Sequence, residues 1–139
     1  MFKLYYASAI DMCVKKAFEH IGEFKKIFEK YSIEVYGAGF GDSPIIPQNC
    51  TQEYKGVITA YDLRKIRECD ILLVVADLDT FCAGTMMELE YARQLGLYII
   101  LLCPDPLKNI FLETFCNKII HNINELELIL ADITRGEKI

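Results

Sequence analysis

This sequence lacks the residue patterns of several common kinds of site. The six cysteines among its 139 residues form no Cys-x-x-Cys pair, and the two histidines, His20 and His121, stand far apart. Zinc centres and disulfide frameworks both need their residues at characteristic spacings. The phosphate-binding lysine motif of nucleotide hydrolases is also missing. We therefore expect no metal, no disulfide framework and no organic cofactor, with most thiols buried as small apolar groups.

The chain also lacks an excess of positive charge and a long apolar run. Fifteen basic residues against twenty acidic ones give a net charge of -5, which argues against binding to a nucleic acid polymer but not against a small nucleotide in a pocket. No apolar stretch approaches the ~20 residues of a membrane-spanning helix. Residues 1–5 carry none of the features of a secretion signal. We expect a cytoplasmic protein with no membrane partner.

What the sequence does contain is an alternation of strand and helix patterns. Apolar runs predict buried strands at 2–7, 32–36, 71–76 and 97–103, with a fifth strand near 118–121. The glycine-rich segment from residue 37 to about residue 52 is typical of a long loop. Five strands alternating with helices predict a single α/β domain over residues 1–139. We expect a doubly wound, five-stranded parallel sheet with helices on both faces, of the flavodoxin or Rossmann kind.

Helical spacing of apolar residues predicts the helices between these strands. One begins near Asp11 and continues to Phe28, and Val57 and Ile66 indicate a second that ends near residue 69. A third runs from about 84 to 96, with apolar residues one turn apart, among them Met87 and Leu95. A short helix precedes the fifth strand, and a terminal helix covers 124 to about 131.

In such a fold, ligands bind beyond the carboxyl ends of the central strands, where the strand order reverses. Residues 6–9 and 77–84 lie there. Glu88 follows in the first turns of a helix, where the helix dipole would favour its ionised form. Taken singly, Glu88 can also be an ordinary helix acid, Asp62 a solvated acid and Tyr5 a core residue.

Three segments in combination favour a functional interpretation. Asp62-Leu63, residues 69–73 and the run Gly-Thr-Met-Met-Glu-Leu-Glu-Tyr-Ala at 84–92 resemble the nucleoside 2-deoxyribosyltransferase family, and residues 3–6 resemble its opening strand. The family includes related deoxynucleoside monophosphate N-glycosidases. The resemblance implies an enzyme that cleaves the N-glycosidic bond of a deoxynucleoside and moves the 2-deoxyribose to another nucleobase.

The resemblance also implies a role for individual residues. Glu88 would be the nucleophile at the anomeric carbon, Tyr5 would orient its carboxylate, and Asp62 would contact the base and help protonate it. Carboxylates suit this chemistry, since an anion stabilises an oxocarbenium-like centre and can form a covalent glycosyl-enzyme. The expected substrate contacts are Ala7, Ser8, Ala9, Asp79, Cys82, Gly84, Met87 and Asn117. Asn117 resembles a residue that a neighbouring subunit supplies, which implies a homo-oligomer of two or more subunits.

The chain departs from the family pattern at several positions. Residues 7–9 and Met86 replace expected glycines. Cys82 stands where transferases carry an acid and the monophosphate hydrolases a serine, and Asp11 occupies the place of the hydrolases' phosphate-binding arginine. That acid favours a free nucleoside over a nucleotide. Two alternatives stay open: hydrolysis of deoxynucleosides or their 5-monophosphates, and a non-catalytic nucleotide-binding or sensing domain.

Overall fold

Five strands alternate with five helices in the computed structural model, which describes residues 1–8, 21–37, 40, 51–75, 83–103 and 109–136. The strands are β1 (Lys3–Ser8), β2 (Glu34–Gly37), β3 (Ile71–Val75), β4 (Tyr98–Leu102) and β5 (Lys118–Ile120). The helices are α2 (Ile21–Lys30), α3 (Gln52–Glu68), α4 (Ala83–Leu95), α5 (Ile110–Phe115) and α6 (Ile123–Thr134). Within these ranges, no helix is both long and apolar enough to cross a bilayer. The helix expected from Asp11 to residue 20 lies outside the described residues.

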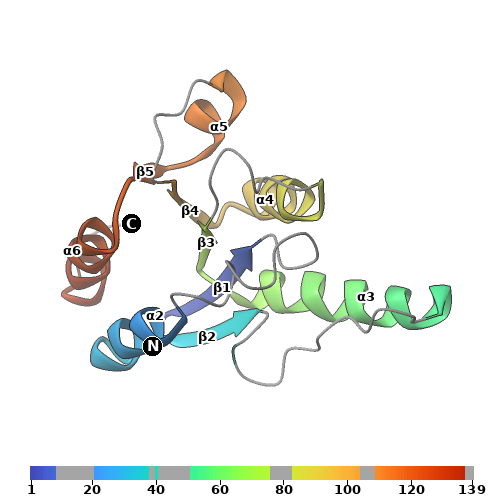
Figure 1. Ribbon diagram of the computed structural model, residues 1–139, viewed down its shortest axis with the longest axis horizontal. Coiled ribbons are helices and arrows are strands. Elements are labelled where there is room, and N and C mark those ends of the chain that lie inside the picture. Colours follow the sequence, from blue (N-terminus) through green and yellow to red (C-terminus); the bar gives the residue numbers. More distant parts are fainter. Residues whose placement is uncertain (9–20, 38–39, 41–50, 76–82, 104–108, 137–139) are drawn as a thin grey trace.

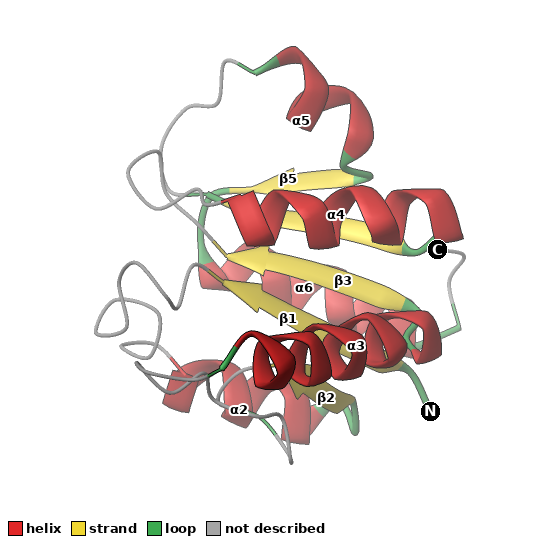
Figure 2. Cartoon of the chain, turned by 90° about the vertical axis from the view of Figure 1, so that its right-hand side faces the viewer, coloured by secondary structure: helices red, strands yellow, loops and turns green. Residues whose placement is uncertain are grey.

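The strands form one all-parallel sheet in the order β2-β1-β3-β4-β5. Helices α3 and α4 cover one face of this sheet, and α2 and α6 cover the other (Figures 1 and 2). The predicted α/β fold with a doubly wound parallel sheet is therefore confirmed. The strand order reverses at β1 and β3, the point where doubly wound folds place their ligands.

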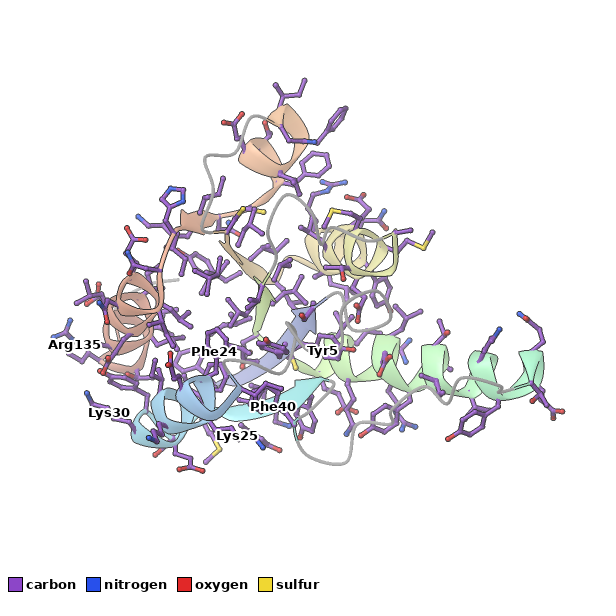
Figure 3. The ribbon with its side chains drawn as sticks, viewed as in Figure 1. Tyr5, Phe24, Lys25, Lys30, Phe40 and Arg135 are labelled. Atoms are coloured by element: carbon purple, nitrogen blue, oxygen red, sulfur yellow. The ribbon has the colours of Figure 1, made fainter. Side chains whose placement is uncertain are left out.

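Strand β1 divides its side chains between two cores, as the two-residue repeat of a strand requires. Leu4 and Tyr6 face α2. The ring centroid of Tyr6 lies 5.6 Å from that of Phe24 in this helix and 5.0 Å from that of Phe40, which follows β2. Tyr5 packs on the opposite side with residues of α3 and α4. Figure 3 shows Tyr5 on the α3 side of β1 and the two phenylalanines on the α2 side. The register of β1 thus directs Tyr5 toward α3 and α4.

Both ends of β2 are set by backbone conformation. Ser32 has a φ of 54°, in the left-handed region, so the chain is still turning there and the strand begins at Glu34 instead of the predicted residue 32. At the other end, Gly37 has a φ of +116°, and a Cβ atom there would lie 2.2 Å from the carbonyl oxygen of Tyr6. Only glycine allows β2 to approach β1 this closely.

Helices α3 and α4 form where the sequence predicts them, but the apolar residues that predicted them do not all face the core. Val57 is 60% exposed, Met87 is 72% exposed, and Leu95 is exposed as well. The buried residues of the two helices are Ile58, Ile66, Thr85, Leu89 and Ala92. Each helix therefore carries apolar side chains on its outer face in addition to those packed on the sheet.

Candidate active site

The three residues expected to be catalytic come together from three different elements. Tyr5 lies in β1, Asp62 in α3 and Glu88 in α4, and the Tyr5 hydroxyl is hydrogen-bonded to both carboxyl groups. Tyr5 is 3% exposed, whereas the two acids are half-buried. This contact needs α3 and α4 packed against each other and against β1, as the fold has them. The doubly wound topology therefore builds a cluster around one phenol group.

Tyr5 is the neutral member of this cluster. Burial, followed by the negative charges of Glu88 and Asp62, raises the pKa of its phenol far above the ordinary value. The hydroxyl therefore keeps its proton at neutral pH. Since a phenol has one O–H, it can donate to only one carboxylate at a time.

The carboxyl group of Asp62 has an unusually high pKa for an aspartate. Burial raises the pKa of its carboxyl group from 3.8 to about 6, and the hydrogen bond with Tyr5 offsets part of this rise. A carboxyl group that titrates close to neutral pH can both give and accept a proton under physiological conditions. The environment of Asp62 therefore fits a general acid and base.

Glu88 lies about one turn beyond the part of its helix in which the helix dipole would stabilise a carboxylate. It is the sixth residue of α4, whose first turn contains no acidic residue, and the effect of the dipole falls off within the first turn. The Tyr5 hydroxyl is hydrogen-bonded to this carboxyl group. Glu90, two residues further on, is bound by Arg93 through two bonds of 2.7 Å. The two neighbouring glutamates therefore differ sharply in their surroundings.

The residues after β1 and β3 that are expected to contact substrate are only partly described. Ala7 is buried on the same side of β1 as Tyr5. Ser8 belongs to the other side, because its hydroxyl is hydrogen-bonded to that of Tyr6. The expected site residues Ala9, Asp79 and Cys82 lie outside the described residues, as does Asp11.

Gly84 and Met87 are both exposed, in the first turns of α4. A Cβ atom at Gly84 would have open space around it, with no atom within 4 Å. The fold itself therefore does not require a glycine at this position. The substrate contacts expected of both residues remain predictions.

Asn117 lies at the amino-terminal edge of the sheet, directly before β5. Its carboxamide oxygen accepts a hydrogen bond of 2.8 Å from the backbone N–H of Ile99, and the backbone N–H of Asn117 donates to the Ile99 carbonyl oxygen at 2.9 Å. This edge is opposite to the one at which the fold places ligands. A catalytic role for Asn117 would therefore belong to a neighbouring subunit, and it stays a prediction.

Two features in and near the cluster leave no signal in the sequence. The hydrogen bond between Tyr5 and Asp62 joins residues far apart in the chain. Thr85, one turn before Glu88 in α4, is 2% exposed, and because a threonine is small enough for a core, the sequence does not single it out. In those ranges no three histidine, cysteine or acidic side chains gather as a metal site would require.

Comparison with known proteins gives one family and a set of similar folds. The family described as nucleoside 2-deoxyribosyltransferase matches residues 4–125. No curated protein matches the sequence significantly.

Three of the similar solved structures have described activities. The 2-deoxyribosyltransferase of Bacillus psychrosaccharolyticus is 18% identical, with a TM-score of 0.76 over 90% of both chains. The CMP N-glycosidase BcmB of Clostridium botulinum is 19% identical, with a TM-score of 0.62 over 93% of this chain and 98% of that one. The Leishmania mexicana 2-deoxyribosyltransferase is 12% identical, with a TM-score of 0.69 over 94% and 98%. At these identities the likeness extends to the fold alone.

Proposed function

This chain belongs to the nucleoside 2-deoxyribosyltransferase family, and we propose that residues 1–139 act as a domain that moves 2-deoxyribose between nucleobases through a covalent intermediate on Glu88. The observation that carries the proposal is the meeting of a nucleophilic carboxylate and a carboxyl group of raised pKa at the Tyr5 hydroxyl. Enzymes that transfer a glycosyl group with retention commonly use two carboxyl groups in different environments.

The first half of the reaction uses Glu88 as the nucleophile and Asp62 as the acid. A carboxylate oxygen of Glu88 bonds to the anomeric carbon while the bond from that carbon to the base nitrogen breaks. The electron pair of the broken bond goes to the nitrogen, which takes the proton of Asp62. The pKa of about 6 means that a useful fraction of Asp62 carries this proton near neutral pH.

The second half of the reaction is the reverse with another base. The nitrogen of an incoming nucleobase attacks the anomeric carbon and loses its proton to the Asp62 carboxylate. The ester bond to Glu88 breaks, which restores the Glu88 carboxylate and leaves Asp62 protonated. Water as the acceptor would give hydrolysis at the same site. The likeness in fold to an N-glycosidase makes that the second candidate activity.

The decisive experiment compares two glutamates of the same helix. Purified wild type, Glu88→Ala and Glu90→Gln are incubated with a deoxynucleoside, with and without a second free base. We expect Glu88→Ala to lose turnover by at least a factor of about 10³ while its circular dichroism spectrum is unchanged. Glu90 is tied to Arg93, so Glu90→Gln should keep most of the activity. Mass spectrometry should find the sugar on a Glu88-containing peptide of the wild type.

The products separate the candidate functions. A new nucleoside made from the second base supports transfer, and free base without exchange supports hydrolysis. Ligand-induced stabilisation without any turnover would support a binding or sensing domain instead. Full activity of Glu88→Ala would refute the assignment of the nucleophile.

We further propose that the protein acts as a homo-oligomer through the side formed by α3, α4 and α5. Eight large apolar side chains are exposed in the described residues, and six of them lie on these three helices. These six are Tyr54, Val57, Met87, Leu95, Ile110 and Phe111. The first turns of α3 also project beyond the sheet (Figure 1). Such a concentration of apolar surface is typical of a protein interface.

The sequence of α3 is complementary to itself in an antiparallel pair. A two-fold axis at Ala60 would place Arg67 of each copy opposite Glu53 of the other, and Arg64 opposite Gly56, where there is no side chain to obstruct it. A surface depression of 410 Å³ follows this outer face and is lined by Val57, Ala60, Tyr61, Arg64 and Arg67. A second copy of α3 is therefore the partner that this face fits.

Charge reversal tests this pairing. Arg67→Glu should shift the protein toward monomer in sedimentation velocity, and the double variant Glu53→Arg with Arg67→Glu should restore the larger species. Arg135→Glu, directly after α6 at the opposite face, is the control and should leave the assembly unchanged. A wild type that stays monomeric at tens of micromolar, or a double variant no better than Arg67→Glu, would contradict the proposed pairing.

A further inference from the structure

We propose that the Tyr5 hydroxyl transfers its hydrogen bond from Glu88 to Asp62 when the sugar becomes attached to Glu88, and so couples the two carboxyl groups. This inference rests on the proposed function, and it gives Tyr5 the role of a positioning residue that responds to the reaction. It starts from the contact that the sequence did not predict, the hydrogen bond between Tyr5 and Asp62.

The geometry provides one donor and two acceptors. The hydroxyl has both carboxyl groups as hydrogen-bond partners, and it has a single proton to donate. Tyr5 is 3% exposed, and its ring packs in the core beside α3 and α4. The ring is therefore fixed in place, and rotation of the O–H bond is enough to change the acceptor.

The position of negative charge decides which acceptor receives the bond, because a hydrogen bond to an ionised group is roughly twice as strong as one to a neutral group. Before the reaction Glu88 is the anion and Asp62 carries a proton, so the hydroxyl donates to Glu88. In the glycosyl-enzyme Glu88 is a neutral ester and Asp62 has given its proton to the departing base. The anion is now Asp62, and the hydroxyl donates to it.

This change of partner links two events of the same step. The hydrogen bond with Tyr5 lowers the pKa of Asp62 against the opposing effect of burial. As Glu88 loses its charge to the sugar, Asp62 therefore becomes more acidic at the moment when the base nitrogen needs a proton. When the ester breaks, the bond returns to Glu88 and Asp62 regains its higher proton affinity.

Other charged groups near Asp62 are committed to partners of their own. Lys65, about one turn further along α3, pairs with Glu68 at 3.3 Å, and its Nζ lies 4.6 Å from the ring centroid of Tyr36 in β2. From β1 the facing titratable group is Tyr5, and from α4 it is Glu88, which is hydrogen-bonded to the same hydroxyl. Among the described residues, burial and the Tyr5 bond account for the altered pKa of Asp62.

The test measures the pKa of Asp62 by carbon NMR of the labelled carboxyl group, with Asp62→Asn to assign its signal and without any substrate. Four proteins are compared: wild type, Glu88→Gln, Tyr5→Phe and the double variant. Glutamine has the shape of the ester and lacks the charge of glutamate. We expect Glu88→Gln to lower the pKa of Asp62 by about one pH unit when Tyr5 is present, and by less than about a third of that in the Tyr5→Phe background.

An equal change in both backgrounds would overturn the proposal, since the coupling would then act through space. No change in the presence of Tyr5 would overturn it as well. If Tyr5→Phe does not fold, the signal of the labelled Tyr5 ring carbon that bears the hydroxyl replaces that arm. It should shift as Asp62 titrates in Glu88→Gln, where the hydroxyl turns to the ionised Asp62, and by much less in Glu88→Asp, which keeps the competing charge. An equal shift in the two variants would refute the switch.

The outcome is independent of the proposed function, because the measurement uses no substrate. A wild type without transferase or hydrolase activity would refute the function and leave the measured coupling standing. An active wild type without the coupling would refute the switch alone.

Discussion

Asp62 should make the folded protein less stable at neutral pH, and Asp62→Asn should therefore stabilise it. The pKa of this carboxyl group is about 6 in the folded chain, above the 3.8 of an unperturbed aspartate. The protonated form thus favours folding. Its contribution is fully present below pH 3.8, is lost as the pH rises through 6, and is absent at pH 8.

The magnitude follows from the difference between the two pKa values. A difference of about two pH units corresponds to about 3 kcal/mol at 1.36 kcal/mol per unit. Asp62 is only half-buried, and solvent screens part of this effect. We therefore expect Asp62→Asn to raise the free energy of unfolding by about 1–2 kcal/mol at pH 8 and by little at pH 4. The asparagine oxygen can still accept the hydrogen bond from Tyr5.

Urea unfolding of both proteins at pH 4 and pH 8 checks this prediction. The difference in the free energy of unfolding between the two proteins cancels the contributions of the other titrating groups. One of these is Glu90, because hydrogen bonds from Arg93 and Gln94 lower its pKa to about 2. Glu29→Gln removes an exposed acid of α2 and should change stability by less than about 0.5 kcal/mol at either pH. An Asp62→Asn protein without added stability at pH 8, or with the same gain at pH 4, would refute the reasoning.

Two further substitutions separate structural roles from functional ones. The added methyl group of Gly84→Ala, at the second position of α4, would lie in open space. The free energy of unfolding should therefore stay equal or rise by up to about 1 kcal/mol, whereas the KM for a deoxynucleoside should rise several-fold. An unchanged KM would contradict the expected substrate contact. Asn117→Ala removes the acceptor of the Ile99 N–H and should lower the free energy of unfolding by about 1–2 kcal/mol. Asn117→Asp keeps that acceptor and should unfold like the wild type, and any loss of turnover it shows then reports the role of the amide in a neighbouring site.

The parts of the fold that could be predicted are those for which a single physical cause leaves a clear pattern in the sequence. The continuous apolar runs of β3 and β4 fit strands covered on both faces, and the structure has them within one or two residues of the predicted bounds. The start of β2 could not be predicted, because it depends on the left-handed turn at Ser32. Backbone conformation of that kind leaves no trace in the apolar pattern.

The packing of α3 and α4 shows why periodicity alone is insufficient. Val57 and Met87 have the spacing of a buried stripe, yet they are exposed, and the core receives Ile58 and Leu89 instead. A helix with apolar side chains on two sides has two possible orientations that the sequence cannot distinguish. The proposed contact between copies of the chain gives the outer residues of α3 a reason to be apolar.

The candidate site could be predicted as three separate residues but not as a connected unit. Glu88, Tyr5 and Asp62 were expected from a resemblance, each with its own role. Their contact depends on the register of β1 and on which side chains α3 and α4 turn toward it. The raised pKa of Asp62 follows from the same packing, since the burial that holds Asp62 beside Tyr5 also disfavours its ionised form. A single structural cause therefore gives Asp62 an acidity suited to proton transfer and a cost in stability at neutral pH.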